Sequence, residues 1–88
     1  MEILKIKLNN PEGLHARPAA IFVQVASKFL SELEIEAHGK VVNGKSIIGI
    51  MSLGAFHGEE ITLTAKGNDE KALISKLNEL IVNEFQAV

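Results

Sequence analysis

The chain has 88 residues, a formal net charge of −2 and no cysteine. This length suits one small domain over residues 1–88, and the slight acidity opposes nucleic-acid binding, which usually needs a basic excess. The absence of cysteine excludes disulfides and thiolate metal sites, and we expect no metal and no cofactor. No apolar run reaches the ~20 residues of a membrane helix, so we expect no membrane insertion and a cytoplasmic location.

Alternation and helical spacing predict the elements of the first half of the chain. Residues 1–8 alternate polar and apolar side chains and form a strand, which ends at an Asn-Asn-Pro loop. Residues 16–29 present a wide apolar face and form a helix, which needs a sheet to cover it. Residues 33–37 and 40–42 form two antiparallel strands joined by a tight His-Gly turn.

The second half of the chain completes an alternation of strands and helices. Ser46 precedes apolar residues 47–53, which predict a short helix, although their isoleucines also permit a strand. Residues 54–58 form a loop, residues 60–65 a strand, and a capping residue with acids after Gly67 starts the last helix. The order βαββαβα predicts an α+β open-faced sandwich: a four-stranded antiparallel sheet with two main helices and one short helix on one face.

The stretch GLHARPAA places a histidine and an arginine where the first helix begins. A helix start leaves backbone N–H groups without partners, here those of Ala16 and Arg17, and these favour an anion. The guanidinium of Arg17 suits phosphate, and neutral imidazole is a nucleophile. The pattern indicates that His15 accepts and releases a phosphoryl group, although a capping or solvated histidine beside a surface arginine fits the same spacing.

The other two histidines do not extend this site. His38 and His57 each precede a glycine in a predicted loop, and we interpret both as solvated turn residues. Their scattered positions do not predict a zinc site, because zinc ligands recur at short, characteristic spacings.

GLHARPAA together with VNGKSIIGIMSLG resembles the histidine-containing phosphocarrier (HPr) family of the bacterial phosphoenolpyruvate-dependent sugar phosphotransferase system. The resemblance covers the length of the chain and its order of elements, and it implies the open-faced sandwich fold. It implies that phosphorylated enzyme I phosphorylates His15 on Nδ1 and that IIA domains of sugar permeases receive the group. Arg17 and the N–H groups of Ala16 and Arg17 would steady the phosphoryl group on a carrier that is regenerated stoichiometrically.

Ser46 is a second candidate site. Its residue type and position alone indicate a helix N-cap. The resemblance adds regulatory phosphorylation by an ATP-dependent HPr kinase/phosphorylase, after which the modified protein serves a carbon-catabolite repressor as corepressor. The phosphate adds a charge of about −2, which we expect to weaken the binding of enzyme I.

The resemblance also implies a partner surface made of apolar side chains beside the reactive histidine. Its expected members are Leu14, Ala20, Ile47, Ile48 and Met51. Core positions are the other interpretation, and we expect them for Ile50 and Leu53. A one-turn helix does not bury every apolar residue, and an exposed apolar cluster often marks an interface.

Three alternative functions stay open. A paralogous carrier of a nitrogen-type regulatory phosphorelay would use the same His15 chemistry for control instead of transport. A docking-only regulator with this fold would work without phosphoryl transfer, and the presence of His15 opposes this. The acidic charge and the lack of Trp and Tyr oppose a small-ligand or nucleic-acid-binding domain. We expect a monomer.

Overall fold

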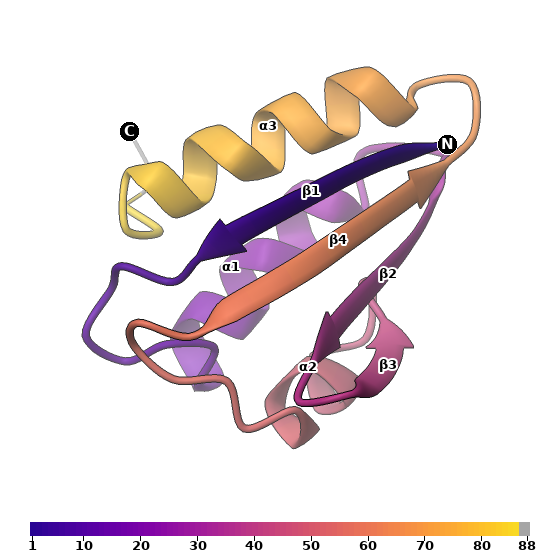
Figure 1. Ribbon diagram of the computed structural model, residues 1–88. Coiled ribbons are helices and arrows are strands. Elements are labelled where there is room, and N and C mark those ends of the chain that lie inside the picture. The colour runs from indigo at the N-terminus through magenta and orange to yellow at the C-terminus, as the bar shows by residue number, and fades with distance from the viewer. Residues whose placement is uncertain (87–88) are drawn as a thin grey trace.

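The computed structural model describes residues 1–86 and contains one four-stranded antiparallel sheet and three helices, in the predicted order (Figure 1). The elements are β1 (Glu2–Lys7), α1 (Ala16–Ala26), β2 (Glu32–Ala37), β3 (Lys40–Asn43), α2 (Ile47–Ser52), β4 (Glu60–Lys66) and α3 (Glu70–Val82). Residues 87 and 88 of the expected 1–88 domain lie outside the described residues. The open-faced α+β sandwich is confirmed.

The last strand in the sequence lies in the middle of the sheet. The strand order is β1-β4-β2-β3, and β4 pairs antiparallel with both β1 and β2. In this register Leu63 of β4 faces Leu4 on one side and Ile35 on the other. Because side chains alternate along a strand, these residues lie on one face, and Glu34 lies on the solvent face. The predicted solvated face is therefore confirmed.

The three helices cover the apolar face of the sheet, which lies in front of α1 and α2 in Figure 1. Phe22 of α1, Ile50 of α2 and Leu77 of α3 are fully buried against the sheet residues. Leu53 is buried as well, so the expected core positions Ile50 and Leu53 are both confirmed. Each large apolar side chain buried in this way contributes about 1.5–3 kcal/mol to folding.

Helix α1 ends at Ala26 and does not continue to residue 29 as expected. Leu30, the residue that follows the expected helix, is 92% exposed. The reason is a tertiary contact that lies outside the local pattern. The carboxylate of Asp69 accepts hydrogen bonds of 2.9 Å from the backbone N–H groups of both Leu30 and Ser31, which hold the chain in its turn toward β2.

Asp69 occupies the N-cap position of α3 but makes no side-chain capping bond. Its carboxylate instead accepts a hydrogen bond from the hydroxyl of Ser31 and from the two backbone N–H groups. The bond from the Ser31 hydroxyl, followed by the bond from the Leu30 N–H, lowers the pKa of Asp69 below its ordinary value of 3.8. Asp69 thus joins the start of β2 to the start of α3.

Candidate phosphoryl-transfer site

His15 is the N-cap residue of α1 and its side chain is exposed. Its backbone is extended, with φ −86° and ψ −168°, which brings the ring over the start of the helix. Nδ1 accepts a hydrogen bond of 2.9 Å from the backbone N–H of Ala16. This bond assigns the lone pair to Nδ1 and leaves the proton of the neutral ring on Nε2. The expected position of His15 at the helix start is confirmed.

The backbone before His15 is fixed by the loop that precedes β4. The N–H of Leu14 donates to the carbonyl oxygen of Ala55 at 3.0 Å, and the Asn10 side chain donates to the carbonyl of Gly13 at 2.8 Å. Gly13 has a φ of +62°, and a Cβ there would lie 2.5 Å from the Ala55 oxygen and 2.7 Å from Cα of Phe56. Only glycine fits this close approach without displacing one of the two loops.

Leu14 does not belong to the surface, contrary to our expectation. Its side chain is only 3% exposed and is part of the core, so it is not available to a partner protein. The hydrogen bond to Ala55 draws this segment inward, and Leu14 anchors the backbone next to His15. Ala20, on the next turn of α1, is half-buried.

Arg17 lies two residues after His15 and lines a different hollow. It lines a hollow of about 500 Å³ together with Pro11, Pro18, Ile21 and residues 84–86. Among the described residues 1–86, its guanidinium makes no hydrogen bond or ion pair, and its backbone N–H has no partner. The structure therefore brings the Ala16 N–H to the ring of His15, whereas Arg17 lines a separate hollow.

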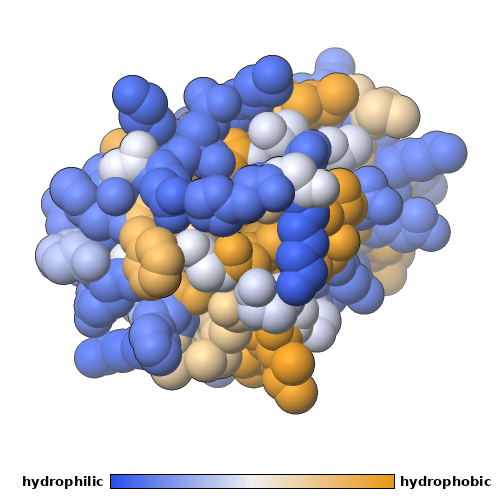
Figure 2. Space-filling model, turned by 60° about the horizontal axis from the view of Figure 1, so that its bottom comes forward, coloured by the Kyte–Doolittle hydropathy of each residue, from blue (hydrophilic) through white to orange (hydrophobic). Residues whose placement is uncertain are grey.

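A shallow depression lies beside the imidazole. It has a volume of about 160 Å³, and its lining comprises Glu12, Leu14, His15, Met51, Gly54, Ala55 and Phe56. Met51 reaches it because α2 packs against α1. Ile47, Ile48 and Met51 are all exposed, Ile48 by 82%, so α2 presents apolar surface next to the site. Figure 2 brings this end of the molecule forward and shows apolar side chains gathered there, bordered by polar ones.

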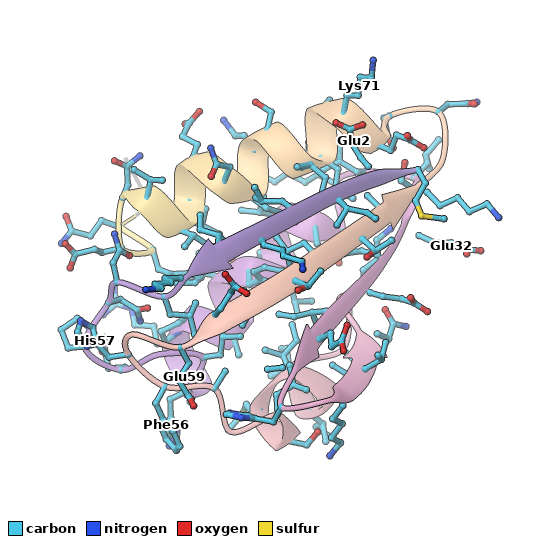
Figure 3. All side chains as sticks on the ribbon, viewed as in Figure 1. Glu2, Glu32, Phe56, His57, Glu59 and Lys71 are labelled. Atoms are coloured by element: carbon cyan, nitrogen blue, oxygen red, sulfur yellow. The ribbon has the colours of Figure 1, made fainter. Side chains whose placement is uncertain are left out.

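Phe56 is a residue of this site that the sequence analysis missed. Its side chain is 65% exposed and lines the same depression as His15. Figure 3 shows it projecting from the loop before β4, with His57 pointing in a different direction. The only signal in the sequence was a large aromatic residue in a segment expected to be loop.

Ser46 is the N-cap of α2, as the sequence predicted. Its Oγ accepts a hydrogen bond of 3.0 Å from the backbone N–H of Gly49, and its side chain is half-buried. The ammonium group of the preceding Lys45 donates to the carbonyl of Phe29 at 2.7 Å. Ser46 is not among the residues that line the depression beside His15, whereas Met51, near the other end of α2, is. His15 and Ser46 are therefore two separate candidate sites.

The remaining histidines occupy loops. His38 has a φ of +55° in the turn between β2 and β3, and its Nε2 lies 3.1 Å from a carboxylate oxygen of Glu59, an interaction that the sequence did not predict. His57 is exposed. Within residues 1–86, no three acidic or histidine side chains form a group that would hold a metal ion. In the same part of the chain, no helix has the length and apolar character to cross a membrane.

Comparisons with known proteins agree with this geometry. A family model described as "PTS HPr component phosphorylation site" matches residues 4–83. Phosphocarrier protein HPr of Buchnera aphidicola is 49% identical over 82 residues, which are 93% of this chain and 95% of that protein. The crystal structure of HPr-C-His from Thermoanaerobacter tengcongensis superposes on this chain with a TM-score of 0.94. The match covers 100% of both chains, and their sequence identity is 48%.

A third relative is Crh of Bacillus subtilis, described as a catabolite repression protein whose crystal structure is a swapped-domain dimer. It is 44% identical, covers 99% of this chain and 100% of its own, and has a TM-score of 0.76. Family match, sequence identity and fold all extend over nearly the whole chain. The chain therefore belongs to the HPr family of phosphocarriers of the phosphotransferase system.

Proposed function

We propose that this protein accepts a phosphoryl group on Nδ1 of His15 from phosphorylated enzyme I and passes it to IIA domains of sugar permeases. The observation that carries the proposal is the place of His15, an exposed N-cap residue whose Nδ1 accepts the backbone N–H of Ala16 at the start of α1. A ring nitrogen that carries a lone pair attacks phosphorus directly once that lone pair is released from its hydrogen bond. Membership of the HPr family supports the same chemistry.

Transfer begins when the hydrogen bond between Nδ1 and the Ala16 N–H opens. The lone pair of Nδ1 then forms the new N–P bond while the bond from phosphorus to the donor breaks, and the donor keeps that electron pair. Nε2 retains its proton throughout. The backbone N–H groups of Ala16 and Arg17 donate to the phosphoryl oxygens, where the helix dipole favours negative charge.

The guanidinium of Arg17 must turn from its own hollow to reach this group. Its fork of donors suits the phosphoryl oxygens, and its permanent charge offsets the charge that arrives with the phosphoryl group. Transfer to a IIA domain is a second displacement: a nucleophile of the IIA domain forms a new bond to phosphorus while the N–P bond to His15 breaks and its electron pair returns to Nδ1.

We also propose that Ala20, Ile47, Ile48 and Met51 contact the partner proteins, because α2 exposes its apolar residues beside His15. Phosphorylation of Ser46 by HPr kinase/phosphorylase would add a charge of about −2 at the start of α2. This charge would have to be desolvated when the apolar residues of α2 dock, which weakens the binding of enzyme I. The same modified form would serve a catabolite repressor.

A docking-only regulator is the second candidate, and the likeness to Crh favours it. The nucleophile His15, with Nδ1 unprotonated, supports a working carrier, whether of a sugar or a nitrogen-type system. We further propose that residues 1–88 form one domain and act as a cytoplasmic monomer. Because the Crh structure is a swapped-domain dimer, sedimentation of the full chain is the appropriate test of the monomer.

The test of the function is phosphoryl acceptance. The protein is incubated with phosphoenolpyruvate and enzyme I, and its intact mass is measured at neutral pH and after acid treatment. We expect an acid-labile increase of one phosphoryl group in the unmodified chain and in His57→Ala, and none in His15→Ala. No increase with an enzyme I that charges another HPr would contradict the carrier and favour the regulator. Transfer from the charged protein to IIA domains of each system then identifies the pathway.

A further inference from the structure

Glu12 lies where the two hollows at the start of α1 meet. It lines the depression of about 160 Å³ beside His15 and also the hollow of about 500 Å³ that Arg17 lines, and no other residue in 1–86 lines both. Its side chain is exposed and forms no hydrogen bond or ion pair within these residues. Glu12 is therefore placed between the nucleophile and the arginine.

The depression beside His15 has no positive side chain that would offset the charge of Glu12. Besides the imidazole, Glu12 is the only ionisable side chain in the lining, which otherwise consists of apolar residues and a glycine. A water molecule occupies about 30 Å³ in the liquid, so the space of about 160 Å³ that Glu12 and His15 share holds about five waters. Two charges this close lie within the Debye length of about 8 Å at physiological salt, and they interact.

Phosphoryl acceptance brings a second anion into this space. The bond from phosphorus to the donor breaks, its electron pair stays on the donor, and Nδ1 of His15 forms the N–P bond. The group on the ring carries a charge of about −2, which the carboxylate of Glu12 repels. The same carboxylate attracts the guanidinium of Arg17, which has to leave its hollow to reach the phosphoryl oxygens. Both interactions raise the free energy of the phosphorylated chain relative to the unphosphorylated one.

We propose that Glu12 sets the phosphoryl-transfer potential of His15: its carboxylate destabilises the phosphorylated form, so that the group is passed on more readily. The inference rests on the proposed function and deepens it. It concerns the equilibrium between the free forms of the chain. A residue that acts only inside a complex with a partner protein changes the rates of transfer and leaves this equilibrium unchanged, so the two roles are separable.

The experiment makes two carriers compete for the same phosphoryl groups. Glu12→Gln and the isotopically labelled unmodified chain are mixed with a catalytic amount of enzyme I and with less phosphoenolpyruvate than carrier. Enzyme I exchanges the groups until equilibrium, and intact masses at neutral pH give the phosphorylated fraction of each chain. At low ionic strength the equilibrium should favour phosphorylated Glu12→Gln about three- to tenfold. The preference should shrink in about 1 M salt, where the Debye length is about 3 Å.

Two further variants serve as controls. Glu32→Gln makes the same change of net charge at an exposed side chain of β2, outside both hollows, and should share the phosphoryl groups equally with the unmodified chain. Glu12→Asp keeps the carboxylate and should also share them nearly equally. Because Glu12 is exposed and unpaired, Glu12→Gln should unfold at the urea midpoint of the unmodified chain.

The outcomes separate the inference from the function on which it rests. Failure of the unmodified chain to accept phosphate contradicts the proposed function. If the unmodified chain is charged, an equal or smaller share for Glu12→Gln overturns the inference alone. An equal gain in Glu32→Gln would attribute the effect to net charge, and a gain that persists in high salt would show that it is not electrostatic. Either result also overturns the inference.

Discussion

Gly13 lies so close to Ala55 that a Cβ on the glycine would stand 2.5 Å from the carbonyl oxygen of Ala55. The next residue donates its N–H to that same oxygen at 3.0 Å. The loop that carries His15 and the loop that carries Phe56 are therefore one packed unit. A change at Gly13 disturbs both of them.

We predict that Gly13→Ala lowers the free energy of unfolding by about 3 kcal/mol, because it adds a steric clash to the cost of a positive φ. Gly54→Ala is the matched control, since Gly54 has the same φ of +62° and nothing within 4 Å of a Cβ. It should cost about 1–2 kcal/mol. Urea denaturation measures both values, and equal losses would show that the close approach to Ala55 contributes nothing.

Arg17 provides a test of the transfer step. We predict that Arg17→Gln lowers the maximal rate of phosphoryl acceptance about 10- to 100-fold, because a hydrogen bond to a charged group contributes about 1.5–3 kcal/mol. Arg17→Lys should retain part of the rate, since lysine keeps the positive charge but lacks the planar pair of N–H donors of the guanidinium. Arg17 is exposed, so both variants should unfold at the urea midpoint of the unmodified chain. An unchanged rate in Arg17→Gln would remove this residue from the mechanism.

Ser46 has a structural role that is separable from regulation. We predict that Ser46→Ala lowers the free energy of unfolding by about 1 kcal/mol, because the Gly49 N–H loses its acceptor. Ser46→Asp should stay near the unmodified value, since aspartate also caps helices, and its charge should weaken transfer from enzyme I.

Ser75→Ala is the control for the Ser46 variants. Ser75 is exposed on α3, where alanine is a good helix former, so this change should not reduce stability. A Ser46→Ala variant as stable as Ser75→Ala in urea would disprove the capping role. Undiminished transfer to Ser46→Asp would contradict the proposed effect of the charge.

Asp69 predicts a pH dependence of stability. Hydrogen bonds from Ser31 and Leu30 lower its pKa below 3.8, so its contribution is fully present above 3.8 and is lost as the pH falls through the lower folded value. Asp69→Asn should therefore lose less stability than the unmodified chain between about pH 5 and about pH 2.

The urea midpoint as a function of pH measures this difference. Glu32→Gln serves as the control, because the exposed Glu32 side chain forms no hydrogen bond or ion pair within residues 1–86, and its profile should match that of the unmodified chain (Figure 3). The ammonium group of Met1, 2.7 Å from the Glu70 carboxylate, also lowers the pKa of Glu70. The pH dependence of stability that comes from Glu70 is therefore present in every variant. Identical profiles for Asp69→Asn and the unmodified chain would contradict the prediction.

The sequence was sufficient for features that depend on neighbours along the chain. Alternation in residues 60–65, the capping serine at 46 and the histidine at the start of α1 each follow from local periodicity or local hydrogen bonding, and the structure confirms them. The solvent face of the sheet follows from the same alternation.

Features that depend on distant contacts were not predictable. Helix α1 stops early because Asp69, far along the chain, holds Leu30 and Ser31. Leu14 and Phe56 are both apolar loop residues, and no local pattern says that the first is buried and the second exposed. The hydrogen bond from Leu14 to Ala55 decides this, and it forms only when the two loops meet.

The central place of β4 in the sheet determines when, during synthesis of the chain, His15 can first accept a phosphoryl group. His15 is synthesised 40 positions before Ala55, and β4 must then still pair with β1 and β2. A nascent chain therefore carries its nucleophile on an unsupported segment until β4, which ends at Lys66, has been synthesised. Charging of His15 in a truncation series should begin only once the chain extends beyond β4, which makes phosphoryl acceptance a reporter of completed folding.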